Sequence, residues 1–251
     1  MSSLFLCDDL AASPHDRGDV VRLTGDEARH AATVNRMRVG EHTAIGDGRG
    51  VIVRGIVTRV DARELELVVE TVERHAEVRL AIVLVQALAK GDRDEMAIQA
   101  ATELGVSGVV PWQAERSVSR WAGPKIAKGV ERWSSIVREA AKQSIRPFVP
   151  EVGDLADTAA LVRLAADVRM LVLEPSAEQR LTALTFTTPT HEATETPIVL
   201  VVGPEGGISP RELTLLTGAG ATPVRLGDEV LRTSTAGPAA LAVLNAALGR
   251  W

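Results

Sequence analysis

Long apolar runs that alternate with amphipathic segments are the feature that most limits how this chain can fold. From residue 79 onward, five strand-length runs contain few polar residues, and segments with helical spacing lie among them. Runs that are apolar along their whole length are typical of a parallel sheet covered on both faces. The pattern predicts an α/β domain with strands in RLAIVLVQAL, GVVPW, VRMLVLE, PIVLVVG and TPVRLG. Helices are expected in GDRDEMAIQAATELG, from about Pro124 to Ser144, and in PRELTLLTGAG and STAGPAALAVLNAALG. The threonine-rich segment 182–196 is expected to be a loop.

The first 70 or so residues have a different pattern. HTAIGDG, GVIVRGIVTRV and ELELVVETV alternate apolar and polar residues and are separated by turn signals, which predicts a compact β meander or barrel. EARHAATVNRM favours one short helix with Asp26 as its N-cap. The charged stretch 73–77 marks the expected boundary, giving domains 1–74 and 75–251.

The charge is distributed unevenly. The chain carries a net charge of -5, yet residues 112–149 hold eight basic side chains against three acidic ones, and residues 22–59 hold seven against four. Localised basic segments on an acidic chain are typical of a polyanion site, because phosphate contacts supply most of the sequence-independent affinity for nucleic acid. Solvated helix faces would give the same pattern, and charge alone does not separate the two.

Several classes of protein are excluded by what the sequence lacks. Cys7 is the single cysteine, so an intramolecular disulfide and a multi-cysteine zinc site are both excluded. No run approaches the roughly 20 apolar residues that span a bilayer, and the first residues do not form a secretory signal. We therefore expect a cytoplasmic protein with no metal and no membrane segment.

Three loops follow predicted strands at the edge where parallel sheets bind ligands. They are LVLEP at 171–175, VVGPEGG at 201–207 and RLGDEVLRTSTAG at 225–237. Glycines let a backbone approach a ligand closely, although VVGPEGG by itself could be a tight turn. Neither GxxxxGK[ST] nor GxGxxG follows these strands, which disfavours a nucleotide hydrolase or an ordinary dinucleotide site.

Three quoted motifs carry a family resemblance. The chain resembles the RsmE family in GPEGGISPRE, in LGDEVLRTSTAGPAAL and in the upstream ERWSSIVREAAKQSIRPFVPEV. Members of that family are SPOUT-class methyltransferases that methylate N3 of a uridine in 16S ribosomal RNA of the small subunit. HAATVNRMRVGEH resembles the PUA-like RNA-binding domain of that family. The resemblance covers nearly the whole chain. It implies a small β-rich PUA-like barrel followed by a SPOUT domain with a C-terminal deep trefoil knot at about 171–251, a homodimer, and S-adenosylmethionine as the cofactor.

The resemblance also implies the residues of the site. Two positions depart from the family pattern: Glu229 stands where an arginine is common, and Ser234 stands where a glutamate is common. Small residues of the last helix (Ala239, Ala240 and Ala246) are expected at the dimer interface. The implied cofactor-binding residues are Leu173, Glu174, Gly203, Glu205, Gly207, Leu226, Gly227, Leu231, Arg232, Thr233 and Ala236.

Methyl transfer to a uracil nitrogen requires alignment and stabilisation of the deprotonated base. Arg232 is the candidate catalytic cation, with a structural role in the third loop as the alternative. Glu205 is a candidate base, although bracing of its loop or an N-cap role is favoured. Trp133 is expected in the core. The expected RNA-binding residues, on one RNA path, are Arg36, Arg38, Arg116, Arg120, Arg138, Lys142 and Arg146.

Other functions remain open at this point. A relative within the same class could act on transfer RNA or on a ribose 2′-hydroxyl. A noncatalytic RNA-binding assembly factor could retain the cofactor pocket only as part of its fold.

Overall fold

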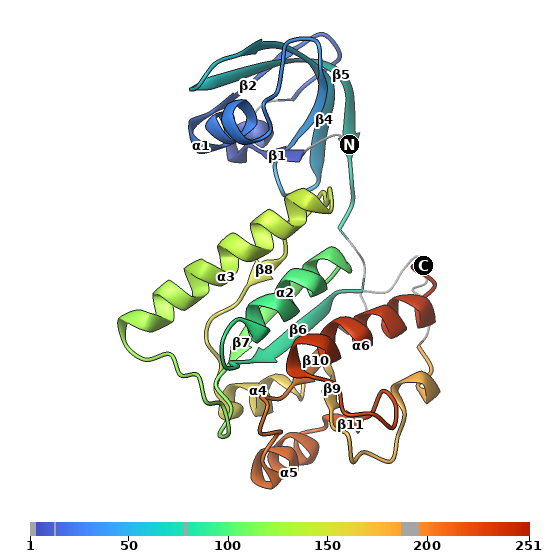
Figure 1. Cartoon of the computed structure of the whole chain (residues 1–251). Helices are drawn as coiled ribbons and strands as arrows, with labels where there is room; N and C mark the ends of the chain where they lie inside the picture. The colour runs from blue at the N-terminus through green and yellow to red at the C-terminus, as the bar shows by residue number, and fades with distance from the viewer. Residues whose placement is uncertain (1–3, 13, 78–79, 187–195) are drawn as a thin grey trace. The chain divides into compact units, whose positions relative to one another are not determined.

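The computed structural model describes residues 4–12, 14–77, 80–186 and 196–251 (Figure 1). The chain forms two compact units. The first comprises residues 1–77 together with 141–149, and the second comprises residues 78–140 together with 150–251. Part of the predicted loop 182–196 lies outside the described residues, and its described start contains the short 3-10 helix η3 (Leu181–Ala183).

The first unit is built on a five-stranded sheet with the order β1-β3-β4-β5-β2. The long strands β4 and β5 alternate buried and more exposed positions, as the period-two pattern predicted, and their buried side chains form the core of this unit. The predicted β-rich unit is therefore confirmed. The strands are β1 (Leu4–Leu6), β2 (Val20–Thr24), β3 (His42–Gly46), β4 (Val51–Val60) and β5 (Glu64–Arg74).

The short helix of this unit differs from its prediction. It begins as α1 (Gly25–Arg29) and continues as the π-helix η2 (His30–Val34), after the 3-10 helix η1 (Asp8–Ala12). Thr24 occupies the N-cap position, so the assignment of Asp26 as N-cap was wrong.

Residues 141–149 return to the first unit through specific contacts. Val149 N–H donates to the Gly48 carbonyl at 2.9 Å, and Gly50 N–H donates to the Pro147 carbonyl at 3.0 Å. Gly50 has a φ of +113°, and a Cβ there would lie 2.7 Å from the Phe148 ring, so this close approach requires glycine. The sequence pattern gave no sign that this segment packs with the small domain.

The second unit contains a six-stranded sheet with the order β11-β9-β10-β6-β7-β8, and every neighbouring pair is parallel. All five residues of the central strand β10 are buried, which is the environment that its apolar run predicted. The strands are β6 (Ile82–Ala87), β7 (Gly108–Trp112), β8 (Glu151–Val152), β9 (Arg169–Leu173), β10 (Ile198–Val202) and β11 (Thr222–Val224).

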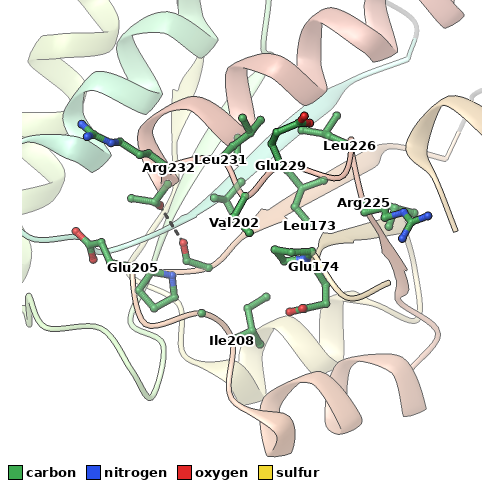
Figure 2. A pocket seen from close by; sticks show the side chains of 18 of the residues that line it. Leu173, Glu174, Val202, Glu205, Ile208, Arg225, Leu226, Glu229, Leu231 and Arg232 are labelled. Carbon is green, nitrogen blue, oxygen red and sulfur yellow. Dashed lines mark hydrogen bonds between the residues drawn. The ribbon is translucent and has the colours of Figure 1, made fainter. Parts of the chain in front are cut away.

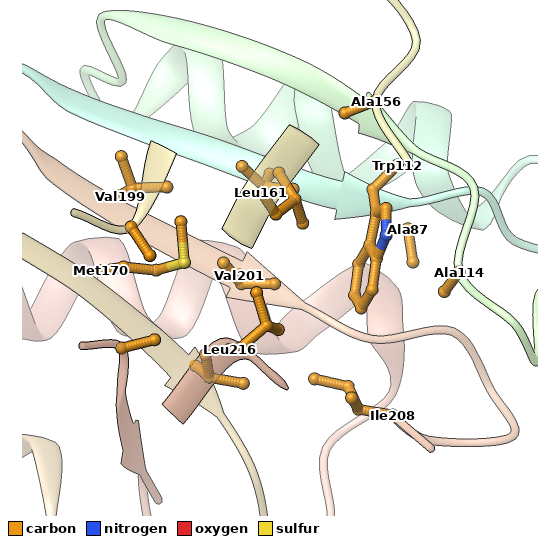
Figure 3. Packing of buried hydrophobic residues seen from close by; sticks show 14 residues of the cluster. Ala87, Trp112, Ala114, Ala156, Leu161, Met170, Val199, Val201, Ile208 and Leu216 are labelled. Atoms are coloured by element: carbon orange, nitrogen blue, oxygen red, sulfur yellow. The ribbon is translucent and has the colours of Figure 1, made fainter. Parts of the chain in front are cut away.

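Helices cover both faces of this sheet. Figure 3 shows Leu161 and Leu216 packed against Val199 and Val201 on one face. On the other face, a Cβ on Gly237 would lie 3.0 Å from the Leu84 side chain of β6 and 3.5 Å from the Val202 side chain of β10. The predicted α/β architecture is confirmed. The helices are α2 (Arg93–Glu103), α3 (Pro124–Gln143), α4 (Thr158–Leu164), α5 (Pro210–Gly218) and α6 (Thr233–Ala247).

Trp133 is buried, as predicted, and makes an edge-to-face contact with Trp121 at 5.6 Å between ring centroids. Trp112 at the end of β7 is also buried. These two indoles therefore serve the core, and Trp121, half-buried, is the more accessible member of the group.

Candidate functional site

A cavity of about 380 Å³ opens at the carboxyl ends of β9, β10 and β11, where the three predicted loops meet. Figure 2 shows Leu173, Val202 and Ile208 converging on it from different segments. All eleven residues predicted to bind the cofactor line this cavity, although they come from positions 173–236. Sequence reasoning missed other lining residues: Arg93, Pro175, Val202, Pro204, Ile208, Val224, Arg225, Glu229 and Val230.

Each glycine of the second loop is required for a different structural reason. A Cβ on Gly203 would lie 2.7 Å from the Cγ1 atom of Ile208, so the chain can fold back here only without a side chain. Gly207 has a φ of +72° and its N–H donates to the Pro204 carbonyl at 2.8 Å, which closes a tight turn. At Gly206, a Cβ would meet the backbone and side chain of Arg116 from 3.3 Å outward. VVGPEGG thus forms a tight turn, and this turn lies at the edge of the cavity.

Glu205 joins the second loop to the turn between β6 and α2. Its Oε1 atom accepts hydrogen bonds from the Lys90 N–H and from Nη1 of Arg93, each at 2.9 Å. Burial opposes ionisation, but hydrogen bonds from its own N–H, Lys90 and Arg93 outweigh this, so the pKa of Glu205 lies below its usual value. A carboxylate that is ionised and already paired is a weak proton acceptor. This geometry favours the bracing role over the role of base.

A buried chain of hydrogen bonds joins the second loop to the third. The Thr233 hydroxyl donates to the Gly203 carbonyl at 2.9 Å (dashed in Figure 2) and accepts from Nε2 of Gln86 at 2.8 Å. Gln86 on β6 is fully buried, and its Nε2 also donates to the Ala87 carbonyl at 3.2 Å. The hydroxyl of Thr233 thus fixes the loops to each other.

The first loop and the start of α6 complete the cavity. Glu174 Oε1 accepts from the N–H and hydroxyl of Ser176, which closes the turn after β9. Arg232 occupies the N-cap position of α6 with an extended backbone and an exposed side chain that lines the cavity. Glu229 lines it as well, and Ser234 is half-buried in the first turn of α6.

The start of α5 is held by a buried carboxylate. Glu212 and Ser209 form a capping box, and Glu212 Oε1 also accepts from the Glu115 N–H and the Thr158 hydroxyl, each at 2.8 Å. The Glu115 carboxylate in turn accepts from the Ser209 hydroxyl and from Arg211, and these bonds hold its pKa below the usual value. The loop after β7 is therefore tied to the segment that follows the second cavity loop.

Two of the predicted RNA-binding residues lie in the loop after β7. Arg116 Nη1 donates to the Gly206 carbonyl at 3.0 Å, and Arg120 donates to the Glu115 carbonyl at 3.3 Å. Both side chains are exposed. Arg116 thus connects a basic loop directly to the second cavity loop.

The other predicted RNA-binding residues have different surroundings. Arg36 and Arg38 are exposed in the first unit, whereas Arg138 is half-buried on α3. Burial lowers the pKa of Arg146 to about 10. Lys142 is buried, and its Nζ forms an ion pair with Glu27 at 2.8 Å. Because the charge of Lys142 is enclosed and paired, we no longer expect it to contact RNA.

Among the described residues there is no group of three or more His, Cys, Asp or Glu side chains that could hold a metal ion. In the same part of the chain, no helix is both long and apolar enough to cross a membrane.

Comparison with known proteins places the chain in a class. Residues 76–245 match the family model of the RNA methyltransferase domain, and residues 23–70 match that of the RNA methyltransferase PUA domain. The chain is thus an RNA methyltransferase with an N-terminal PUA domain.

Similar proteins narrow the class to one family. Ribosomal RNA small subunit methyltransferase E of Mycobacterium tuberculosis is 41% identical over the whole chain and 94% of its own length, and that of Bacillus subtilis is 32% identical over 89% of the chain and 88% of its own. The crystal structure of the Neisseria gonorrhoeae enzyme bound to S-adenosyl methionine has a TM-score of 0.83, at 28% identity and 98% coverage of both chains. A Legionella pneumophila methyltransferase structure with bound SAM has a TM-score of 0.84, at 30% identity and 98% coverage of both chains. The chain belongs to the ribosomal RNA small subunit methyltransferase E family.

Proposed function

We propose that this protein transfers a methyl group from S-adenosylmethionine to N3 of a uridine in 16S ribosomal RNA. The observation that carries the proposal is the convergence of all eleven predicted cofactor residues on one cavity. The family membership supports the choice of substrate. S-adenosylmethionine is also the ligand in the Neisseria gonorrhoeae structure.

The cavity suits this cofactor in size and chemistry. Its volume of about 380 Å³ lies in the range of small-molecule sites. Leu173, Val202 and Ile208 provide apolar walls for an adenine ring, and the glycines expose backbone groups for its polar edge. We propose that Glu174 and Glu205 shape their loops, and that backbone N–H and C=O groups make most of the polar contacts.

When bound, S-adenosylmethionine supplies an activated methyl group on a sulfonium, so the protein has to align and activate the uracil. N3 becomes a nucleophile when it loses its proton, and a cation near the ring stabilises the resulting anion. We propose Arg232 for this role because it is exposed at the cavity while its backbone is fixed at the start of α6.

We further propose that residues 171–251 form a deep trefoil knot and that the protein is a homodimer. Of the three alanines predicted at the interface, Ala240 is fully buried within its own chain, whereas Ala239 is half-buried and Ala246 is exposed. The exposed side of α6 that carries Ala246 is thus the better candidate. Sedimentation of Ala246→Arg and the unaltered chain at equal concentration tests it, and an unchanged mass would refute this interface.

RNA binding is proposed for the exposed arginines of each unit. Arg36 and Arg38 in the first unit and Arg116 and Arg120 in the second are accessible to phosphate. Removing two phosphate contacts should weaken binding and reduce the slope of log K against log salt by about 2. An unaltered slope would assign the two arginines to a solvated face.

Nucleoside mass spectrometry tests the proposed reaction. Small-subunit RNA lacking modifications is incubated with the protein and S-adenosylmethionine, digested and analysed. N3-methyluridine is expected. A 2′-O-methyl nucleoside, or modification of transfer RNA alone, would refute the proposal in favour of another methyltransferase. Absence of cofactor binding by calorimetry would indicate a noncatalytic assembly factor.

A further inference from the structure

Arg93 is a second cation at the cavity and comes from outside the three cofactor loops. It is the first residue of α2, directly after the turn that follows β6, and its side chain lines the cavity. Its side chain is 44% exposed. A guanidinium in this position can meet a ligand without first leaving the protein interior.

The orientation of Arg93 is fixed by a residue of the second cavity loop. Its Nη1 donates to Glu205 Oε1 at 2.9 Å, and the same oxygen accepts from the Lys90 N–H. Glu205 is the more enclosed partner, with a side chain 25% exposed. An arginine carries five N–H donors, so one bond to Glu205 leaves others for a second acceptor. The hydrogen bond to Glu205 thus orients the guanidinium and leaves its other N–H groups able to donate to a ligand.

We propose that Arg93 is a catalytic residue of the methyl transfer and Glu205 its positioning residue. The inference rests on the proposed function. Arg93 donates to a carbonyl oxygen of the target uracil as negative charge develops there, while Glu205 keeps the guanidinium in place. Uracil carries carbonyls on both sides of N3, so Arg93 and Arg232 can each serve one of them.

The step balances without a further reactant. The N3 proton passes to solvent water, and the N3 electron pair forms a bond to the methyl carbon. The carbon–sulfur bond breaks and its electrons remain on sulfur, which leaves neutral S-adenosylhomocysteine. Stabilisation of the uracil anion lowers the pH at which N3 is deprotonated.

The charged groups around the cavity allow a pH test. Besides the two partners, these are carboxylates and guanidinium groups from the other loops. The ionisable side chains that line the cavity are Arg93, Glu174, Glu205, Arg225, Glu229 and Arg232. None is a histidine, but Asp94, next to Arg93 in the first turn of α2, has its pKa raised to about 6 by burial. A change in the rate profile on the alkaline side of neutrality would therefore report the uracil itself.

The test compares Arg93→Ala and Arg93→Lys with Arg163→Ala, a matched control on the exposed side of α4. Arg93→Ala should lower kcat at pH 7 by about 10²- to 10³-fold. Its cofactor Kd by calorimetry should stay within about twofold, and its deficit should shrink as the pH is raised. Arg93→Lys should recover part of the rate, and Arg163→Ala should match the unaltered protein.

Other outcomes would overturn the inference. If Arg93→Ala raises the cofactor Kd and lowers the rate equally at every pH, Arg93 merely supports the loop. If only the KM for RNA rises, Arg93 is a phosphate contact. A Glu205→Gln variant with unaltered kcat would remove the positioning role. Failure of the proposed function is separate, because the unaltered protein would then form no N3-methyluridine.

Discussion

Replacing Thr233 with valine tests the connection between the second and third cavity loops. The hydroxyl is buried, donates to the Gly203 carbonyl at 2.9 Å and accepts from Gln86 Nε2 at 2.8 Å. Valine has nearly the same shape, so the change removes two hydrogen bonds without opening a cavity.

The expected loss of unfolding free energy depends on the two groups that lose the Thr233 hydroxyl as their partner. The Gly203 carbonyl loses the Thr233 hydroxyl, whereas Gln86 Nε2 keeps its bond to the Ala87 carbonyl at 3.2 Å. Gln86 Oε1 is already buried without a partner, so this amide has little capacity to rearrange. The Gly203 carbonyl is only partly buried at the cavity, so we expect the loss of its partner to lower the free energy of unfolding by about 1–2 kcal/mol. If the misplaced loops weaken the binding free energy of the cofactor by about 1.4 kcal/mol, cofactor affinity falls tenfold.

Urea unfolding and calorimetry with S-adenosylmethionine measure the two effects. Thr233→Ser is the matched control, because it keeps the hydroxyl and loses only a methyl group. The serine variant should retain affinity within about threefold while the valine variant loses about tenfold. Equal losses in the two variants would show that the methyl group matters and would refute the hydrogen-bond account.

Three further results are expected. Gly203→Ala should lower both cofactor affinity and thermal stability, because its Cβ would lie 2.7 Å from the Ile208 side chain. Gly218→Ala is the matched control, because a Cβ there would have nothing within 4 Å and should change neither property. Burial raises the pKa of Asp94 to about 6, so the folded state binds more protons than the unfolded state between about pH 4 and 6. The contribution of Asp94 to the free energy of unfolding therefore rises as the pH falls through this range. Urea unfolding of Asp94→Asn that follows the unaltered protein across the same pH range would contradict this. Lys142→Met should cost about 3 kcal/mol of unfolding free energy, because it removes the cation that pairs with the partly buried Glu27 carboxylate. The slope of log K for RNA binding against log salt should stay constant, and a reduced slope would show that Lys142 does contact RNA.

The regular elements of the second unit could be predicted because their patterns are local. The run PIVLVVG became β10, buried throughout, and the expected helix from Pro124 to Ser144 became α3, which ends at Gln143. The cavity residues came from the family motifs, since only those motifs relate positions as distant as Leu173 and Ala236. Periodicity would have given the strands and left the site as three separate loops.

What could not be predicted depends on contacts between distant segments. Lys142 had the sequence context of a solvated helix face, and its pairing with Glu27 depends on the return of residues 141–149 to the first unit. Arg93 lies in the unremarkable stretch GDRDE, and only its hydrogen bond to the carboxylate of Glu205 in the second cavity loop shows its orientation. The position of GDRDE directly after a predicted strand, at the ligand-binding edge of the sheet, was the sequence signal that could have marked Arg93 as a site residue.

We propose that the three-loop cavity serves methyl transfer to a uracil nitrogen of 16S ribosomal RNA. The most direct test of this proposal is transfer of a labelled methyl group from S-adenosylmethionine into small ribosomal subunits lacking modifications, followed by mapping of the labelled nucleotide. We expect one labelled uridine in 16S ribosomal RNA, carrying the methyl group on N3. Label on a ribose hydroxyl, on another base, or no label with a protein that binds the cofactor would contradict it.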